Sequence, residues 1–244
     1  MAHFRAKPET EAAEKVQALF AASKDSLQDR LDSFPKYVRR PVLTRFLALY
    51  EIFKRILPVK GSIVECGVFR GFGLMSWAKL SAILEPTNLT RRIYGFDSFK
   101  GFPTPHVKDK NKLIAAKRGH LSSDSYDELN SLIELYDMDR YIGHVPKVKL
   151  VNGDARKTIP KFIKEHRHLV ISLLFLDFDL YEPTRLAMRH FMPRMPKGSI
   201  LAFDELDNPI WPGETEALLE EAGVRNFRIQ RLEFDPYIGF AVIE

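Results

Sequence analysis

The stretch Ser62-Ile-Val-Glu-Cys-Gly-Val-Phe-Arg-Gly-Phe-Gly73 predicts the fold class of this chain. It begins with an apolar run, residues 63–66, that carries a single acid, Glu65. A turn that contains Gly67 and Gly71 follows, and the residues after it repeat apolar positions with a helical period. A buried strand, a tight glycine turn and a helix form the first unit of a doubly wound, Rossmann-like α/β sheet. Ligands of such sheets bind at the carboxyl ends of the strands, where glycines let a ligand lie against the backbone.

The spacing of this turn indicates the kind of ligand. It is Glu-x-Gly-x-x-x-Gly rather than the Gly-x-Gly-x-x-Gly of dinucleotide-binding turns. A carboxylate at Glu65 would repel a phosphate, whereas the N-terminus of the following helix favours an anion such as a carboxylate. S-adenosylmethionine, which has no phosphate and carries positive charge, meets both conditions. The alternative is a plain strand-turn-helix unit of another α/β protein.

Composition sets the limits within which the motifs are interpreted. The 244 residues are 45% hydrophobic and 28% charged, with a net charge of +5, as expected for one globular α/β domain with elaborations. The basic residues are scattered, so nucleic-acid binding is not expected. The one cysteine, Cys66, lies in the predicted strand and is interpreted as a buried structural thiol. No apolar run is long enough to span a membrane, and residues 1–14 have no secretory apolar segment, so we expect a cytoplasmic protein.

Two regions differ in their pattern. Residues 1–58 predict an N-terminal helical extension, with helices near 10–31 and 41–57 that pack on the sheet, cap the site or join two subunits of a homo-oligomer. Residues 59–244 predict the α/β domain, in which the long stretch 98–146 is interpreted as a lid and substrate-recognition insert. Five parallel strands and a terminal antiparallel pair are expected.

An acid follows each of the next two predicted strands in the sequence. Asp97 ends the strand 92–96, where it is placed to accept hydrogen bonds from a ribose diol or to cap a loop. Asp154 follows the strand 148–151, where it faces an adenine amino group or caps the next helix. Residues alone leave the two possibilities for Asp154 open.

The stretch 169–184 contains a continuous apolar run that predicts a central parallel strand buried on both faces. It ends in Asp177 and Asp179, and the next strand, 198–203, ends in Asp204-Glu205. Adjacent strands therefore bring four acids to one edge. Oxygen-only ligands of this kind suit magnesium, calcium or manganese. The alternative is that these acids are unrelated helix caps and surface residues. Trp211, which follows them in the sequence, either forms a wall of a substrate pocket or covers the core.

Together these motifs resemble the macrocin O-methyltransferase type of class I S-adenosylmethionine-dependent methyltransferases. The resemblance extends from about residue 60 to 216, and its most specific part is Asp177-Phe-Asp-Leu-Tyr-Glu-Pro-Thr184. The other matching motifs are Val64-Glu-Cys-Gly-Val-Phe-Arg-Gly71, Gly95-Phe-Asp-Ser-Phe99 with Gly101-Phe-Pro103, Gly153-Asp154, and the stretch 198–205.

The resemblance implies metal-dependent methylation of a hydroxyl on a sugar or glycoside, with magnesium as the expected ion. It implies Asp179 as the general base and Asp177, Asp204 and Glu205 as metal ligands. The family commonly has two aspartates where this chain has Asp204-Glu205. The cofactor-binding residues that it implies are Glu65, Gly67, Phe69, Arg70, Gly71, Asp97, Ser98, Asp154, Ala155 and Asp177.

The sequence therefore predicts transfer of the sulfonium methyl group of S-adenosylmethionine to a sugar hydroxyl. Two alternatives remain at this stage. Asp177-x-Asp179 matches the metal-binding pair of nucleotide-sugar glycosyltransferases, but that hypothesis leaves Glu65 and Asp97 unexplained. A non-catalytic binding protein of methyltransferase fold would be expected to have lost site acids, and all of them are present.

Overall fold

A computed structural model describes residues 7–113 and 116–244 of the chain. It divides into two compact units, the first ending at Leu47 and the second running Ala48–Glu244. Helix α3 (Arg40–Ile56) contributes to both, since the division falls within it.

The first unit consists of short helices with little buried surface. The predicted helix 10–31 is two helices, α1 (Lys7–Ala22) and α2 (Leu27–Asp32), separated at residues 23–26. Ser26 caps α2 by accepting the backbone N–H of Asp29. The 3-10 helix η2 (Phe34–Lys36) follows. Neither α1 nor α2 has a buried residue, so their predicted role in joining subunits stays a prediction.

The second unit is built on a seven-stranded sheet in the order β3-β2-β1-β4-β5-β7-β6 within the described residues. The first five strands pair in parallel and β7 pairs antiparallel with both β5 and β6, so the predicted strand count and directions are confirmed. The strands are β1 (Ser62–Cys66), β2 (Ile93–Asp97), β3 (Val148–Asn152), β4 (Ile171–Leu176), β5 (Ile200–Phe203), β6 (Gln230–Arg231) and β7 (Gly239–Val242).

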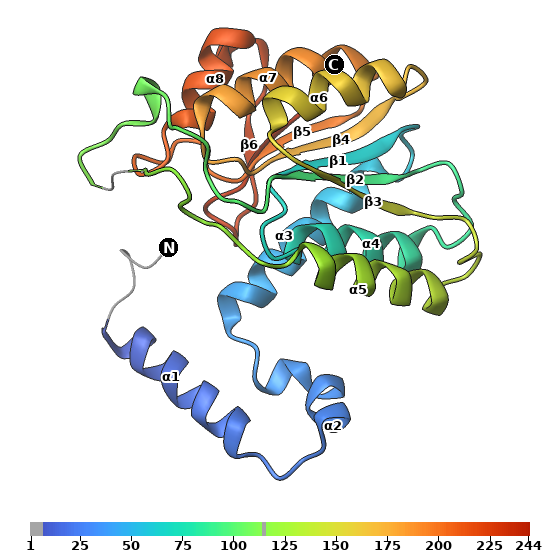
Figure 1. The fold of residues 1–244 in the computed structure, drawn as a ribbon, viewed down its shortest axis with the longest axis vertical. Helices are drawn as coiled ribbons and strands as arrows, with labels where there is room; N and C mark the ends of the chain where they lie inside the picture. The colour runs from blue at the N-terminus through green and yellow to red at the C-terminus, as the bar shows by residue number, and fades with distance from the viewer. Residues whose placement is uncertain (1–6, 114–115) are drawn as a thin grey trace. The chain divides into compact units, whose positions relative to one another are not determined.

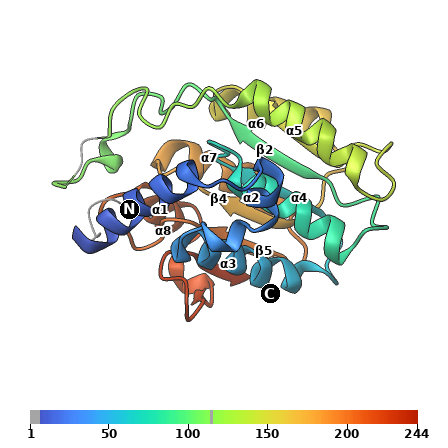
Figure 2. The same ribbon diagram turned by 90° about the horizontal axis from the view of Figure 1, so that it is seen from below.

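Helices cover both faces of the sheet. Helices α6 (Ala155–Glu165), α7 (Tyr181–Phe191) and α8 (Gly213–Glu221) lie on one face, and α4 (Phe72–Leu84) and α5 (Tyr126–Asp139) lie on the other, with α3 beside them from residue 48 on (Figure 1). Figure 2 shows this second helical layer from below. Every residue of β4 is buried, which explains why its sequence is apolar at every position except Ser172 rather than alternating. The short 3-10 helices of this unit are η3 (Val107–Asp109), η4 (Met192–Arg194) and η5 (Val224–Asn226).

Arg91 joins several segments at the amino ends of the central strands. It is only 2% exposed, and its guanidinium pairs with Glu85 at 2.9 Å. Its Nη2 donates to the carbonyl oxygens of Ile56 at 2.9 Å and Val59 at 3.0 Å, and its Nη1 donates to that of Gly61 at 3.1 Å. A buried cation with so many acceptors links the end of α3 to the beginning of β1. The hydropathy pattern contained no sign of this role.

No helix among the described residues is both long enough and apolar enough to cross a membrane.

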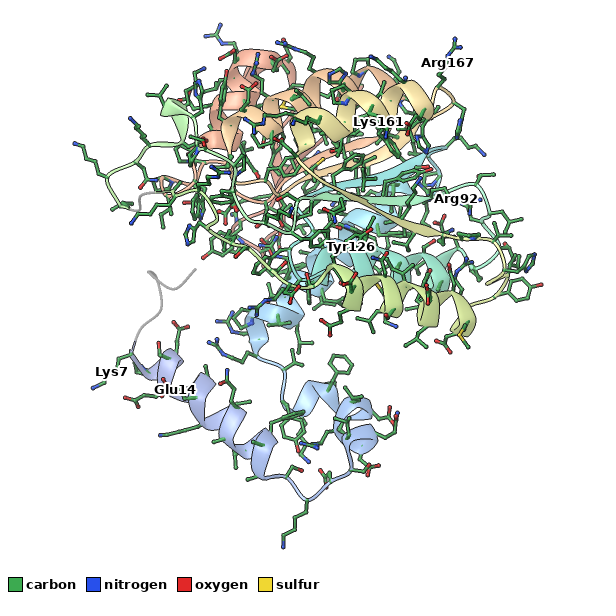
Figure 3. The ribbon with its side chains drawn as sticks, viewed as in Figure 1. Lys7, Glu14, Arg92, Tyr126, Lys161 and Arg167 are labelled. Atoms are coloured by element: carbon green, nitrogen blue, oxygen red, sulfur yellow. The ribbon has the colours of Figure 1, made fainter. Side chains whose placement is uncertain are left out.

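We predict that Arg91→Met destabilises the protein by about 3–5 kcal/mol, because the substitution leaves Glu85 and several carbonyls buried without their partner. Urea unfolding followed by circular dichroism measures the change. Arg167→Met is the matched control, since the Arg167 side chain points away from the sheet into solvent (Figure 3). A loss below about 1 kcal/mol, the range of exposed ion pairs, would contradict this role of Arg91.

Candidate active site

The sheet brings the predicted site residues to its carboxyl edge. Beyond the last paired residues, backbone hydrogen bonds continue from strand to strand. The Asp177 N–H donates to the carbonyl oxygen of Cys66 at 2.7 Å, and the Asp204 N–H donates to that of Leu176 at 2.9 Å. The Gly153 N–H donates to the backbone carbonyl oxygen of Asp97 at 2.8 Å. The ends of the first five strands therefore form one continuous edge, as the sequence predicted.

The glycines of the loop between β1 and α4 are required by neighbouring parts of the chain. Gly67 has a φ of +100°, and a Cβ there would lie 1.8 Å from the carbonyl oxygen of Asp177. Gly71 has a φ of +82°, and a Cβ there would lie 2.2 Å from the Leu129 side chain of α5. Close approach of a ligand was the reason predicted for these glycines. The structure adds a second reason, which is close packing against β4 and the insert.

Asp97 holds the same loop through its carboxylate. Its Oδ2 accepts the backbone N–H of Val68 at 2.8 Å and of Phe69 at 2.7 Å, and its Oδ1 accepts that of Phe99 at 2.7 Å. A carboxylate has about four acceptor positions, so one remains for a ribose hydroxyl. The structure thus shows Asp97 as an organiser of the loop, and its predicted contact with ribose stays a prediction.

Glu65 is a buried acid with an unsatisfied oxygen. It is 2% exposed, and burial together with the charge of Asp97 raises the pKa of its carboxyl well above the usual value. One oxygen, Oε1, lies so near the first turn of α4 that a Cβ on Gly73 would be 2.3 Å away. The other, Oε2, is buried without a hydrogen-bond partner. A buried acceptor costs free energy until a donor reaches it, so this position fits the ammonium group of S-adenosylmethionine.

The remaining predicted cofactor residues lie on the loops beside this edge. Phe69 is 38% exposed, with the Arg70 guanidinium 5.2 Å from its ring centroid, and Ser98 donates to the carbonyl of Gly101. Asp154 caps α6 by accepting Arg156 N–H, and its ion pair with Arg156 lowers the pKa of its carboxyl. The helix cap is thus observed, whereas contacts of Asp154 and Ala155 with adenine stay predictions.

Asp179, Asp204 and Glu205 form an acidic cluster, each less than 10% exposed. Burial, with the neighbouring charges of Glu205 and Asp204, raises the pKa of Asp179 well above its usual value. Asp179 also has a φ of +59°, which is uncommon outside glycine and marks a constrained backbone. Within residues 7–113 and 116–244, no group of three or more His, Cys, Asp or Glu side chains is arranged to hold a metal ion. The ligand set Asp177, Asp204 and Glu205 therefore stays a prediction.

Glu214 is a site residue that the sequence did not indicate. It is fully buried at the start of α8, and its two oxygens accept the backbone N–H groups of Asp179 at 3.2 Å and Glu205 at 3.1 Å. Burial and the charges of Asp179 and Asp204 raise the pKa of its carboxyl. In the sequence it is one of two acids in the first turn of a helix, Glu214 and Glu216, so no signal distinguished it.

The insert, residues 98–146, is fastened to both halves of this edge. Buried Asp109 accepts the N–H of Tyr181 at 2.7 Å, so it caps α7 just after the acidic loop. On the other side, the Ser123 and Ser125 hydroxyls donate to the carbonyl oxygen of Phe69. The insert thus contacts the β1–α4 loop and the start of α7, and its role in substrate recognition stays a prediction.

The sheet order and this edge define a class I S-adenosylmethionine-dependent methyltransferase. The model of the macrocin O-methyltransferase family, TylF, matches residues 44–225. The chain therefore belongs to the macrocin O-methyltransferase family, and the resemblance predicted from its motifs is confirmed.

Individual relatives agree with this assignment. The 8-demethyl-8-(2,3-dimethoxy-alpha-L-rhamnosyl)-tetracenomycin-C 4'-O-methyltransferase of Streptomyces olivaceus is 27% identical over 152 residues, which are 60% of this chain and about half, 53%, of that protein. The crystal structure of the calicheamicin methyltransferase CalS11 is similar with a TM-score of 0.94 and 33% identity, over 98% of this chain and 93% of that chain. An apo structure of CalS11, described as a TDP-rhamnose 3'-O-methyltransferase, is similar with a TM-score of 0.86 and 31% identity, over 98% and 95%.

We predict that Glu65→Gln weakens binding of S-adenosylhomocysteine about 10- to 100-fold, the loss expected for a hydrogen bond to a charged group. Calorimetric titration measures the affinity. The variant should unfold at the same temperature or higher, because glutamine replaces a buried ionisable group by a neutral side chain of similar size. Glu128→Gln, on the exposed face of α5, is the control and should bind as the wild type does. Equal affinity of Glu65→Gln and wild type would contradict a cofactor role for Glu65.

Proposed function

We propose that this protein transfers a methyl group from S-adenosylmethionine to a hydroxyl of a deoxysugar, carried by a nucleotide or by a glycoside. The observation that supports this most is the buried Asp179, whose carboxyl has a raised pKa and belongs to the same strand-end edge as Glu65. Two similar proteins bear names that state methylation of rhamnose or a rhamnosyl compound. Family membership favours methyl transfer over the glycosyl-transfer alternative.

The chemistry divides between the cofactor and the acidic edge. S-adenosylmethionine supplies the methyl group from its sulfonium and leaves as S-adenosylhomocysteine, while a carbon–oxygen bond forms on the acceptor. A sugar hydroxyl is a weak acid, so a base must take its proton as that bond forms. Asp179 is our candidate base, because a raised pKa makes its carboxylate a stronger base than an exposed aspartate. Alignment of methyl carbon and oxygen is worth about 7–11 kcal/mol when the geometry is ideal.

We also propose that the edge takes a divalent cation, with magnesium as the first candidate. The support is the donor set: acids within one buried cluster repel one another, and oxygen donors suit magnesium. Asp177, Asp204 and Glu205 would hold the ion, and its charge would stabilise the developing oxyanion of the acceptor. Glu214 would keep the Glu205 backbone in place, since it accepts the Glu205 N–H.

For the base, we predict that Asp179→Asn lowers kcat by about 100- to 10,000-fold while binding of S-adenosylhomocysteine is retained. Asparagine tolerates a positive φ, so the backbone of this loop should persist. Asp207→Asn is the matched control: Asp207 also has a positive φ, +61°, but is exposed. Transfer of labelled methyl groups to rhamnose derivatives measures kcat, and wild-type turnover by Asp179→Asn would exclude it as the base.

For the cation, we predict that removal of divalent ions with a chelator lowers methyl transfer about 100-fold or more, and that magnesium restores it. This magnitude follows from the several kcal/mol of charge stabilisation that a metal supplies. Calorimetric titration with magnesium should show binding that Asp204→Asn weakens, without a change in S-adenosylhomocysteine affinity. Full activity of the chelated protein would contradict the proposed metal requirement.

A further inference from the structure

Three aromatic side chains meet where the insert approaches the loop between β5 and α8. The ring centroid of Phe102 lies 5.5 Å from that of Trp211 and 5.7 Å from that of His120, in edge-on contacts. His120 and Trp211 are 6.0 Å apart. Phe102 is only 8% exposed, whereas His120 is exposed and Trp211 is partly exposed. The buried phenyl ring therefore supports two rings that keep surface open to solvent.

We propose that His120 and Trp211, supported by Phe102, form an aromatic platform on which the acceptor sugar ring stacks. This inference rests on the proposed function and names the part of the protein that recognises the sugar. It takes Trp211 as a substrate wall, which is one of the two possibilities that the sequence left open. The class of ligand is a pyranose with an apolar carbon–hydrogen face, in particular a 6-deoxyhexose.

The platform is held in place from both sides. On the insert, Phe102 N–H donates to the His120 carbonyl at 2.8 Å, and Gly119 N–H donates to the Phe102 carbonyl at 2.9 Å. On the other side, the Asn111 side chain donates to the carbonyl of Ile210 at 2.6 Å, next to Trp211. The insert and the Trp211 loop are therefore joined directly, and in Figure 1 the green insert lies beside α8, which agrees with this contact. Rings fixed in this way lose little conformational entropy when a ligand binds.

The platform also lies close to the acidic cluster. Trp211 precedes Glu214 by three residues, which span at most about 11 Å when fully extended. Glu214 in turn accepts the backbone N–H groups of Asp179 and Glu205. The Asn208 side chain of the same loop donates to Glu205. The loop that carries Trp211 is therefore tied to the acidic cluster at Asn208 before the tryptophan and at Glu214 after it.

The ring surfaces suit a sugar rather than a purely apolar ligand. Ligand sites combine apolar and aromatic walls with a few polar groups, and the amphipathic rings of His and Trp present a flat apolar face with a polar N–H at the edge. A 6-deoxyhexose has the complementary form: one apolar face, a methyl group and a rim of hydroxyls. The second tryptophan, Trp77, shows the structural alternative, since it is fully buried between α4 and the sheet.

Tryptophan fluorescence tests the proposal, because Trp77 and Trp211 are the two tryptophans of the chain. The protein is saturated with S-adenosylhomocysteine and titrated with TDP-rhamnose and, separately, with methyl α-L-rhamnoside. These probes share the sugar ring and differ in the nucleotide, so they separate recognition of the ring from recognition of the diphosphate. We expect both to change the emission of the wild type and neither to change that of Trp211→Phe, in which only buried Trp77 remains.

Kinetics give the second measurement. For the rhamnose probe that the wild type accepts as substrate, Trp211→Ala should raise KM about 10-fold or more with a smaller change in kcat. Trp211→Phe should recover most of the loss because it keeps an aromatic face. S-adenosylhomocysteine affinity should not change in either variant. Leu132→Ala, at an exposed apolar position on α5, is the control and should match the wild type.

The outcomes separate the platform from the proposed function. If the wild type methylates a rhamnose probe but its emission does not respond, or Trp211→Ala keeps the wild-type KM, the platform is wrong and the function stands. If the wild type methylates neither probe, sugar methylation as proposed fails and the platform fails with it. The emission titration uses wild type and the conservative Trp211→Phe, so it decides even if Trp211→Ala does not fold.

Discussion

The carboxylate of Glu214 determines how the acidic edge of this protein is arranged. Two loops that are far apart in the sequence each give one backbone N–H to it, one from Asp179 and one from Glu205. A fully buried carboxylate beside other acids is unfavourable by itself, and burial raises its pKa accordingly. The two N–H groups offset part of that cost and fix the spacing of the loops. The pairing of β4 with β5 brings the two loops side by side, and Glu214 then joins their backbones beyond the end of that pairing.

Side chains of the insert likewise hold backbone groups of distant segments around the site. Asp109 caps α7 from outside that helix, and the hydroxyls of Ser123 and Ser125 hold the carbonyl of Phe69. Asn111 then ties the insert to the loop that carries Trp211. One segment therefore contacts the loop between β1 and α4, the first turn of α7 and the loop that carries Trp211. An insert linked in this way can place an acceptor relative to the methyl donor, which is the alignment that methyl transfer requires.

Sequence patterns predicted the sheet and the residues at its edge, because strand burial, glycine turns and strand-end acids all have local signatures. The continuous apolar run of β4 and the glycine turn at Gly67 were sufficient for the fold. The partners of these residues were not predictable, because they depend on contacts between distant segments. Glu214, Asp109 and Arg91 were ordinary charged residues in the sequence, and only the packed structure shows them buried against backbone groups.

The most direct test of the central claim is the mass of a rhamnose acceptor after incubation with the protein and S-adenosylmethionine that carries a trideuterated methyl group. TDP-rhamnose and methyl α-L-rhamnoside are incubated with magnesium, and the products are analysed by mass spectrometry and fragmentation. We predict that one trideuteromethyl group replaces one hydroxyl hydrogen of the sugar ring. If neither acceptor gains it while S-adenosylhomocysteine binds normally, the cofactor assignment holds and the proposed sugar acceptor is contradicted.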